Sequence, residues 1–460
     1  MNEIIKAKHI QKVVQEVSIQ KIMQDIVEAY QSDQLPWIVG FSGGKDSTAL
    51  LQMVYYSIAR LPICDRKKHI YVLASDTRVE MPIISERIRR ELENIQLAAE
   101  RDKLPITTHL VFPKLNDTFW VNLIGRGYPS PNSHFRWCTE RLKIKPVSAF
   151  INKVVNDTGK VVILLGARKS ESSTRAQTMQ RYHIEGNRFR PHTNLKNAWI
   201  YTPIEALTAN DVWIYLLQVP NPWNGDNRGL IKLYKNASGE CPLVVDDSTP
   251  SCGQSRFGCW TCTVIDNDKS LKSLVCSGEE KLEPLLELRD YLSYIRNKEG
   301  ARCDLRRNGQ IPLRRGTEEI MVNTGPFTYN TRVDILKRVL EAQFISGITL
   351  IEGDELAIIQ EIWIKEENSS LNKPDLPFDL VLTIWKYIYK DIPMPTNSNL
   401  YDYLNKEDQL LNSSCQKYGI PLEMMRRLRD IEEEYGHLKR RHGLPEEMRE
   451  TIREYISSIE

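Results

Sequence analysis

Apolar residues recur three or four positions apart over the first 34 residues. The pattern runs from Ile10 to Ile26 and ends near Ser32. This period is that of a helix with one buried face. We therefore expect residues 1–34 to form one amphipathic helix or two.

From residue 37 on, short apolar runs alternate with longer amphipathic stretches. The short runs predict strands and the longer stretches predict helices. Strands that alternate with helices form a parallel sheet covered on both faces, with ligands at the carboxyl ends of the strands. We therefore expect an α/β domain whose functional residues follow its strands. The predicted strands are Trp37–Phe41, His69–Ala74, Ile106–Phe112 and Val161–Leu165, and the predicted helices include Ser47–Ala59 and Ser85–Glu100.

The pattern changes after about Pro220. Proline, glycine, asparagine and cysteine gather there, and after about Gly278 the sequence is charged and mostly helical. A chain of 460 residues is long enough for several domains. We predict four parts: a helical segment (1–34), the α/β domain (35–225), a cysteine-rich segment (226–280) and a mostly helical C-terminal domain (281–460).

Charge and hydropathy say little about the partners and the location of the protein. The 62 lysines and arginines nearly balance the 60 aspartates and glutamates, so contact with nucleic acid would need a local basic patch. No apolar run reaches the roughly 18 residues of a membrane span, and charges are scattered through the first residues, so we expect a cytoplasmic protein with no membrane partner. The candidate basic patch, which could also be a solvated turn, comprises Arg302, Arg306, Arg307, Arg314 and Arg315.

A glycine-rich loop stands between the first predicted strand and the helix that follows it. Its two glycines allow backbone N–H groups to approach a phosphate, and the helix N-terminus and Lys45 add positive charge. Asp46 follows the lysine where a Walker loop has serine or threonine, and its carboxylate suits magnesium held on pyrophosphate. The alternative is a turn without a ligand. The predicted phosphate-binding residues are Ser42, Gly43, Gly44, Lys45, Asp46 and Ser47.

Polar residues also follow the second and fourth predicted strands. Asp76 is able to bond a ribose hydroxyl or an adenine amino group, unless it only caps a helix. Arg168 and Arg175 are able to hold phosphate oxygens in a bidentate way, and a surface ion-pair network is the alternative. We expect the segment from Asp211 to Trp213 to pack rather than react.

One thiol lies among cations. Cys138 is flanked by Arg136, Arg141, Lys143 and Lys145. Neighbouring positive charge lowers the pKa of a cysteine toward the reactive thiolate. Cys138 is therefore a candidate sulfur acceptor, and a buried inert thiol is the alternative.

Four further cysteines lie close together: Cys241, Cys252, Cys259 and Cys262. In a chain without an export signal, such a group indicates a metal site rather than disulfides. Zinc ribbons usually have two CxxC knuckles, and this segment has one. A [4Fe-4S] cluster held by all four thiols and a structural zinc are both open here, and the irregular spacing favours the cluster over zinc and over no metal.

The glycine-rich loop resembles the PP-loop of the N-type ATP pyrophosphatases, adenine nucleotide alpha hydrolase-like enzymes that split ATP into AMP and pyrophosphate. Three more segments are similar to the phosphoadenylylsulfate (PAPS) reductase branch. Residues 76–82 resemble its DTG…PET segment, although Arg78 stands where that family has glycine. Residues 166–176 resemble its G-x-R-x-x-E-S-x-x-R motif, and residues 203–213 resemble its PI…T…DVW segment.

The resemblance implies ATP and Mg²⁺ as ligands of the α/β domain. The residues that we predict to bind the nucleotide are those of the loop together with Asp76, Gly166 and Arg168. The residues that we predict to take part in catalysis are Lys45, Asp46, Cys138, Arg168 and Arg175.

Taken together with the cysteine spacing and the charged C-terminal extension, these segments resemble the DndC family, the sulfur-transfer components of bacterial DNA phosphorothioation systems. The resemblance implies that sulfur replaces a non-bridging oxygen of a DNA backbone phosphate. It also implies a cysteine desulfurase as sulfur donor and the proteins DndD and DndE as partners on DNA. The alternatives are a tRNA-thiolating PP-loop enzyme, a PAPS or adenylylsulfate reductase, and a nucleotide-gated DNA-binding subunit without catalysis.

Overall fold

The contacts of the computed structural model divide the chain into two compact units, residues 1–392 and 393–460. The sheet and the residues of the predicted site belong to the first unit. The structure describes residues 18–133, 135–171, 173–181, 187–238, 258–265, 267–304, 325–369, 380–390, 392, 394, 411–436 and 443–457.

Six strands of the first unit form one sheet in the spatial order β3-β2-β1-β4-β6-β5. Neighbouring strands are parallel except at one edge, where β5 runs antiparallel to β6. At the centre, Trp37 pairs with Ile70 on one side and with Val162 on the other. The strands are β1 (Trp37–Gly40), β2 (Ile70–Ser75), β3 (Ile106–Val111), β4 (Val161–Leu164), β5 (Arg190–Pro191) and β6 (Ala198–Tyr201).

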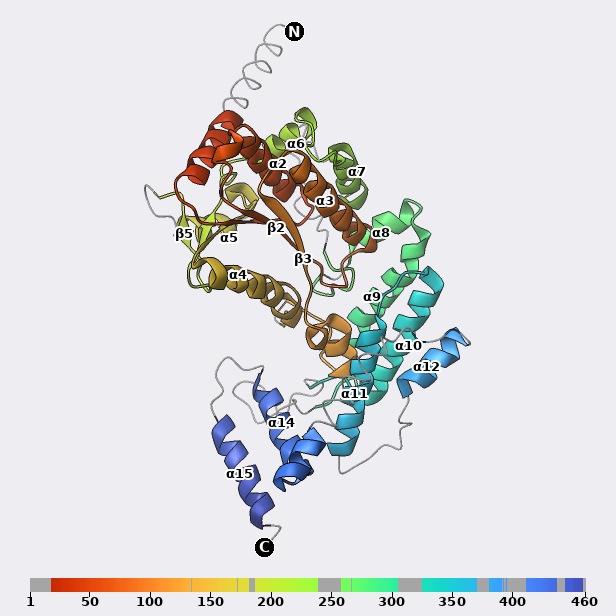
Figure 1. The fold of residues 1–460 in the computed structure, drawn as a ribbon. Helices are drawn as coiled ribbons and strands as arrows, with labels where there is room; N and C mark the ends of the chain where they lie inside the picture. The colour runs from red at the N-terminus through yellow and green to blue at the C-terminus, as the bar shows by residue number, and fades with distance from the viewer. Residues whose placement is uncertain are drawn as a thin grey trace. The chain divides into compact units, whose positions relative to one another are not determined.

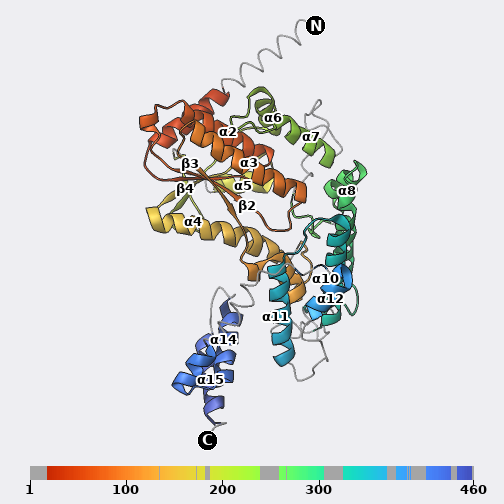
Figure 2. The ribbon, with the colours of Figure 1, turned by 45° about the vertical axis from the view of Figure 1, so that its right-hand side comes forward.

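Helices cover both faces of this sheet. Helices α2 and α3 lie over one face and α4 lies over the other (Figure 1, Figure 2). Below the sheet, Ile151 and Val154 of α4 pack with Ile38 and Ile163 of the central strands. The helices around the sheet are α2 (Lys45–Ala59), α3 (Pro82–Arg101), α4 (Lys145–Thr158), α5 (Ser173–Arg181), α6 (Ala209–Gln218) and α7 (Asn227–Ser238).

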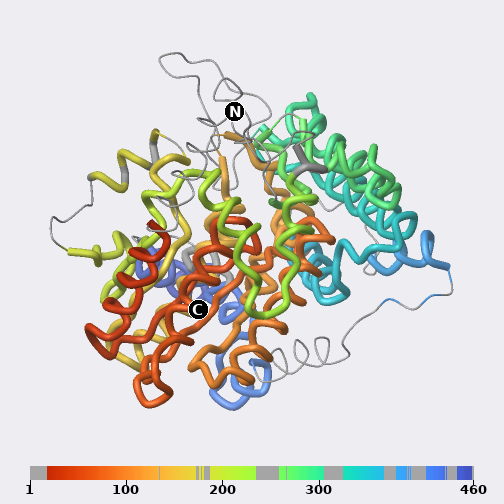
Figure 3. Tube along the Cα trace, turned by 90° about the horizontal axis from the view of Figure 1, so that it is seen from above, coloured from red at the N-terminus to blue at the C-terminus, as the bar shows by residue number. Residues whose placement is uncertain are grey.

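A helical layer follows the sheet in the same unit. Seen from above, its helices gather to one side of the sheet (Figure 3). Two of its side chains bond to the backbone of the segment that follows β3. Trp363 Nε1 donates to Ile124 O at 3.1 Å, and Arg332 Nη1 donates to Gly125 O at 2.6 Å. The layer comprises α8 (Lys269–Cys276), α9 (Glu283–Ile295), α10 (Tyr329–Ser346), α11 (Gly353–Ser369) and α12 (Leu380–Tyr389).

The second unit contains α14 (Leu422–Gly436) and α15 (Leu444–Ser457), which contact each other. Together with the layer α8–α12, it confirms the prediction of a mostly helical C-terminal region. Within the described residues, no helix has the length and apolar character needed to cross a membrane. The four-part division of the chain stays a prediction.

The sequence pattern predicted the main elements of the sheet domain. The four predicted strands and two predicted helices are confirmed, with ends that differ by one to three residues. Helix α3 begins at Pro82 rather than Ser85, because proline suits the first position of a helix. Residues 18–31 are helical, in agreement with the predicted N-terminal helix. Strands β5 and β6 were not predicted, and the two residues of β5 are too few to give a periodic pattern.

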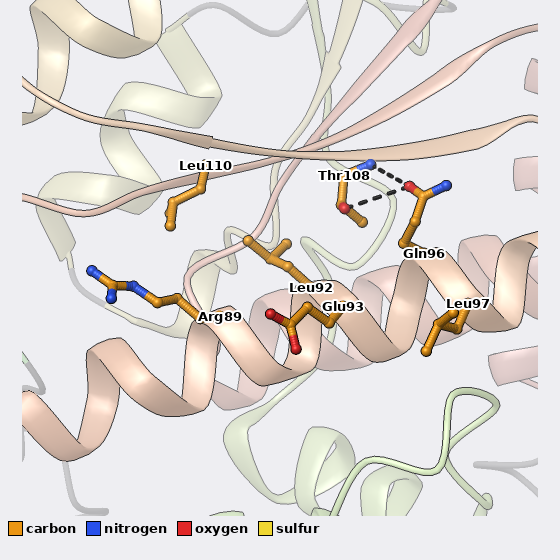
Figure 4. Close-up of a pocket in the computed structure, with 7 residues that line it drawn as sticks. All are labelled: Arg89, Leu92, Glu93, Gln96, Leu97, Thr108 and Leu110. Atoms are coloured by element: carbon orange, nitrogen blue, oxygen red, sulfur yellow. Dashed lines mark hydrogen bonds between the residues drawn. The ribbon is translucent and has the colours of Figure 1, made fainter.

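An open groove lies where α3 crosses the edge strand β3 (Figure 4). Within it, Gln96 Oε1 accepts a hydrogen bond from Thr108 N at 3.0 Å, so a side chain satisfies a donor at the sheet edge. The groove follows the face of α3, and its residue Arg89 also pairs with Asp76 at the end of β2. Its lining residues are Arg89, Leu92, Glu93, Gln96, Leu97, Thr108 and Leu110.

Candidate active site

The glycine-rich loop connects the carboxyl end of β1 to the N-terminus of α2, as predicted. Gly43 adopts a φ of +68°, which favours glycine, and lets the chain reverse after Ser42. The Ser47 hydroxyl accepts from Ser42 N at 3.2 Å and donates to Gly44 O at 3.0 Å. These bonds fix the conformation of the loop at the first turn of α2, where the backbone N–H groups have no acceptor within the helix.

Tyr234 of α7 covers this loop. Its hydroxyl accepts a hydrogen bond from Lys45 N at 3.4 Å, and the Lys45 ammonium lies 5.4 Å from the centre of its ring. Burial raises the pKa of Tyr234 to about 12, so the phenol is neutral at physiological pH. The hydroxyl therefore occupies a position at which a phosphate oxygen would accept the same bond.

Asp46 is the centre of an ion-pair group. Its Oδ1 accepts from Arg168 Nε at 2.6 Å, and its Oδ2 lies 3.1 Å from Lys45 Nζ. Arg168 is buried and also donates to Ser170 Oγ at 2.9 Å. The structure thus brings three predicted residues together across 122 positions of sequence.

Gly166 lies close to the backbone of Asp46. A Cβ added there would lie 2.8 Å from Asp46 O, so a larger residue would push the strand-end loop away from α2. This contact explains a glycine in the segment after β4.

Asp46 fits the predicted role as a magnesium ligand. Each carboxylate oxygen keeps acceptor capacity beyond its one cationic partner, and carboxylate is a preferred magnesium donor. Asp46 would contribute one ligand, and the phosphates of the nucleotide would contribute others.

Asp76 lies at the carboxyl end of β2 and is buried. Its Oδ1 accepts from Arg78 N at 2.8 Å, and its Oδ2 accepts from Arg89 Nη2 at 3.1 Å. It is not the N-cap of α3, which is Met81. Asp76 therefore shapes the turn after β2, and its role in binding the nucleotide stays a prediction.

Of three further residues from the sequence analysis, the side chain of one lies outside the described part of the chain and two have structural roles. Arg175 belongs to α5, but its side chain lies outside the described part of the chain. The prediction that Asp211 and Trp213 pack is confirmed: Asp211 forms a reciprocal capping box with Thr208 at the start of α6, and Trp213 is buried.

The described end of the cysteine-rich segment, residues 258–265, lies against the turn after β2, and we call it the thiol strap. Cys259 Sγ lies 3.4 Å from Thr77 Oγ1 and 3.8 Å from Glu80 Oε1. Trp260 N donates to Val79 O at 3.0 Å. Burial, followed by the nearby Glu80 carboxylate, raises the pKa of Cys259 to about 12.

Cys138 is electrostatically coupled to both strap thiols, Cys259 and Cys262. The expectation that its neighbours lower its pKa is wrong: burial and the nearby Cys262 raise the pKa of the Cys138 thiol above its ordinary value. Burial is the largest cause, and three of the four cations that flank Cys138 in the sequence pair with carboxylates. Lys143 pairs with Glu80 at 3.0 Å, and Arg141 and Lys145 pair with Asp117.

The fit of a metal centre rests on donor chemistry. Cys259 and Cys262 form one CxxC turn, in which Cys262 N donates to Cys259 O at 3.1 Å. Cys241 and Cys252 lie outside the described residues. Within the described residues, no group of three or more His, Cys, Asp or Glu is placed to hold a metal ion. Thiolates are the donors that iron–sulfur clusters and structural zinc use, so Cys259 and Cys262 fit as two of the ligands, and the four-cysteine site stays a prediction.

The thiol strap is also fixed from the helical layer. Arg289 of α9 is buried and donates to Cys262 O at 3.2 Å. Arg296 donates to Thr263 O at 2.8 Å and to Pro131 O at 2.9 Å. These bonds join the strap, the loop before Cys138 and α9.

The candidate basic patch is only partly described. Arg302 donates from Nε to Gly325 O at 2.8 Å, so its guanidinium serves local packing. Arg306, Arg307, Arg314 and Arg315 lie outside the described residues.

Sequence reasoning missed Tyr234 and the pairing of Lys143 with Glu80. Tyr234 lies on α7, whose amphipathic pattern gives no sign of which residue faces the loop. Glu80 and Lys143 are 63 positions apart in sequence, so only the fold brings them to Cys259.

Fold and site together define an α/β protein with a glycine-rich loop after β1 and a thiol against the turn after β2. Residues 36–265, half of the chain, match the family model of the phosphoadenosine phosphosulfate reductase domain. The chain belongs to this family.

A curated relative from Methanocaldococcus jannaschii, itself an uncharacterized protein, is 27% identical over 241 residues. The matched region is 52% of this chain and 39% of the relative. This chain therefore spans about two fifths of the length of that relative.

Three solved structures are similar at a distance. PAPS reductase from Candida auris in a phosphate complex has a TM-score of 0.28 and 13% identity, over 46% of this chain and 84% of that one. FMN adenylyltransferase from Candida glabrata has 0.28 and 12%, over 51% and 68%. The U34-tRNA thiolase NcsA from Methanococcus maripaludis with its [4Fe-4S] cluster has 0.29 and 10%, over 64% and 84%. Similarities this distant carry no argument about the function of this chain.

Proposed function

We propose that the chain is an ATP-dependent sulfurtransferase of the PP-loop type that adenylates a DNA backbone phosphate and replaces a non-bridging oxygen by sulfur. One observation carries the proposal. The phosphate loop follows β1, and the strap thiols lie against the turn that follows the adjacent strand β2. The loop that would bind the ATP phosphates and the thiols that would transfer sulfur thus lie at the carboxyl ends of adjacent strands.

The proposed reaction has two displacements. A non-bridging oxygen of the DNA phosphate attacks the α-phosphorus of ATP, forms a P–O bond and releases pyrophosphate. A sulfur nucleophile then attacks the adenylated DNA phosphorus, and the bond to AMP breaks. If the nucleophile is a persulfide on Cys138, a second thiol must reduce the resulting S–S bond to release the phosphorothioate. The persulfide sulfur would come from a cysteine desulfurase.

The residues of the loop supply the first displacement. Lys45 and Arg168 carry positive charge beside the position of the phosphates, where negative charge develops in the transition state. Asp46 orients both cations and would hold Mg²⁺. ATP binding would also require Tyr234 to release the Lys45 amide.

The strap and Cys138 would supply the second displacement. Cys241, Cys252, Cys259 and Cys262 would hold the predicted [4Fe-4S] cluster, which would supply redox or sulfur-binding chemistry. DndD and DndE are the proposed partners that bring the DNA site. The DNA substrate and these partners rest on the family resemblance of the sequence.

The first test compares source cells with wild-type protein and with Lys45→Ala. DNA and RNA are digested separately, and sulfur-containing nucleotides are measured by mass spectrometry. We expect phosphorothioate dinucleotides to disappear from DNA, because Lys45 is needed to bind the ATP phosphates. Exposed Lys67→Ala, on the connection before β2, is the matched control and should leave them unchanged.

Two results would contradict the proposal. If DNA contains no phosphorothioate in either strain while a thiolated RNA base disappears, the chain is a tRNA-thiolating enzyme. If the purified protein forms no AMP and pyrophosphate with either nucleic acid present, it is not an ATP pyrophosphatase.

A further inference from the structure

The turn after β2 contains a residue in an unusual backbone conformation. Arg78 has a φ of +63°, in the left-handed region that favours glycine. The resembling PAPS reductase segment has glycine at this position. A side chain held there at a conformational cost is a reason to ask what the side chain does.

The side chain of Arg78 lies against an aromatic ring. Its guanidinium carbon is 5.7 Å from the ring centre of Phe112, the residue that directly follows β3. Phe112 is 39% exposed, so the pair is accessible to solvent. A guanidinium that lies over an aromatic ring contacts it through its planar face. The N–H donors at the edge of the guanidinium are then able to bind an anion.

The charge of Arg78 has no carboxylate partner within ion-pair distance among the described residues. The charge of Arg78 opposes the rise in pKa that burial causes at Glu355, but no ion pair joins the two residues. Glu355 Oε2 accepts from Glu352 N at 3.0 Å, and the buried Glu355 Oε1 has no hydrogen-bond partner within the described part of the chain. Four other cations around the site have carboxylate partners. Those that pair with carboxylates are Lys45 and Arg168 with Asp46, Arg89 with Asp76, and Lys143 with Glu80.

The position of Arg78 connects it to the thiol strap. The preceding residue, Thr77, contacts Cys259 Sγ, and the following residue, Val79, accepts from Trp260 N. The guanidinium itself lies against Phe112, so an anion held by Arg78 would lie at the carboxyl ends of β2 and β3, on the turn that the strap contacts.

We propose that the Arg78 guanidinium, backed by Phe112, binds a phosphodiester of the DNA strand and holds it beside the thiols. This inference rests on the proposed function and adds the residue that positions its substrate. A phosphodiester fits because its two non-bridging oxygens match the planar donor fork of a guanidinium. A nucleotide phosphate is the other source of the same chemistry, and the test separates the two.

The test measures binding of a fluorescein-labelled DNA duplex by anisotropy over a series of salt concentrations. Arg78→Gly removes the guanidinium and installs the residue that the +63° backbone favours, so the fold is not expected to suffer. We expect affinity to fall about tenfold, because a bidentate charged contact is lost. The slope of log affinity against log salt should decrease by about one.

Three further variants separate charge, geometry and strain. Arg78→Lys keeps the charge without the planar fork and should bind with intermediate affinity. Arg78→Ala should lose as much DNA affinity as Arg78→Gly. It should unfold at a lower temperature than Arg78→Gly, because alanine, unlike glycine, does not favour a positive φ. Lys298→Ala is the matched control, since Lys298 lies 5.8 Å from the Tyr294 ring centre at the end of α9. It should bind DNA as the wild type does.

Each contrary outcome has a distinct meaning. Unchanged DNA affinity and salt slope in Arg78→Gly would overturn the Arg78 inference alone. Weakened ATP binding with unchanged DNA binding would overturn it in favour of a nucleotide contact. A loss confined to an RNA of the same sequence would overturn the DNA source. If the wild type binds neither DNA nor RNA, the inference and the proposed function both fail.

Discussion

A single phenol hydroxyl stands at the entrance to the phosphate loop. Tyr234 accepts the Lys45 amide bond that a phosphate would otherwise accept, and its ring covers the Lys45 ammonium. The Lys45 amide therefore has an acceptor without a ligand. At this amide, a bound phosphate would exchange one acceptor for another.

We predict that Tyr234→Phe tightens ATP binding. The variant leaves the Lys45 amide without its acceptor, and a net hydrogen bond is worth about 0.5–1.5 kcal/mol, or about two- to tenfold in affinity. Isothermal titration calorimetry measures the change. Tyr56→Phe removes a hydroxyl that donates to Pro220 O away from the loop and should have no effect. Weaker binding in Tyr234→Phe would mean that the hydroxyl contacts the nucleotide instead.

Residue chemistry was predictable where it depends on adjacent positions. The loop from Ser42 to Ser47 folds as its glycines require. The environment of Cys138 was not predictable from its cationic neighbours, because Asp117 and Glu80 arrive from other elements and pair with them. A sequence shows which charges are present, whereas the pKa depends on which of them remain unpaired.

At the scale of the element, strand β3 carries a titratable group. His69 on the connection into β2 and His109 on β3 are both bonded to the Thr107 hydroxyl, at 2.9 and 3.1 Å. Burial lowers the pKa of both rings below the ordinary value, and for His109 the nearby His69 and Lys153 lower it further. Both rings are therefore neutral in the folded protein near pH 7.

We predict that stability falls as the pH drops below the ordinary histidine pKa. The unfolded chain then binds protons that the folded chain resists, so the free energy of unfolding decreases with falling pH. The double variant His69→Gln with His109→Gln should show a shallower decline of the thermal midpoint between pH 7 and pH 5, measured by circular dichroism. Equal declines in the variant and the wild type would contradict the role of this pair.

Elements were predictable in proportion to their length and periodicity. The twenty residues of α3 repeat an apolar face several times, and its existence was evident from the sequence. The two residues of β5 contain no repeat, and its antiparallel pairing with β6 depends on the chain between residues 191 and 198. Short edge strands form because a neighbour is present, which a local pattern does not record.

At the scale of the molecule, the thiol strap joins the sheet to the helical layer. Its backbone bonds run to Val79 on one side and to Arg289 and Arg296 on the other. Trp260 is buried and its ring centre lies 6.0 Å from that of Trp120. The cysteines are thus held by the packing of two layers as well as by any metal.

We predict that Cys259→Ala abolishes the brown colour and visible-range absorbance of anaerobically purified protein. Loss of one of four thiolates removes a ligand that an iron–sulfur cluster requires. Cys276→Ala changes an exposed cysteine of α8 and should keep the colour. A colourless wild type that contains one zinc ion would reverse the choice of metal.

The organisation of the molecule was predictable only in outline. The order of an α/β domain, a cysteine-rich segment and helices follows from composition. That the strap returns to the turn after β2 was not predictable, because Cys259 and Thr77 are 182 positions apart.

The bond from Thr108 to Gln96 has a consequence for the behaviour of the protein at high concentration. An exposed edge strand is a template on which a second copy of a chain can add a strand. Here the backbone N–H of Thr108 already donates to the Gln96 side chain of α3. A second copy that pairs with β3 must first break this internal bond, so edge-to-edge pairing of two copies is opposed at this point.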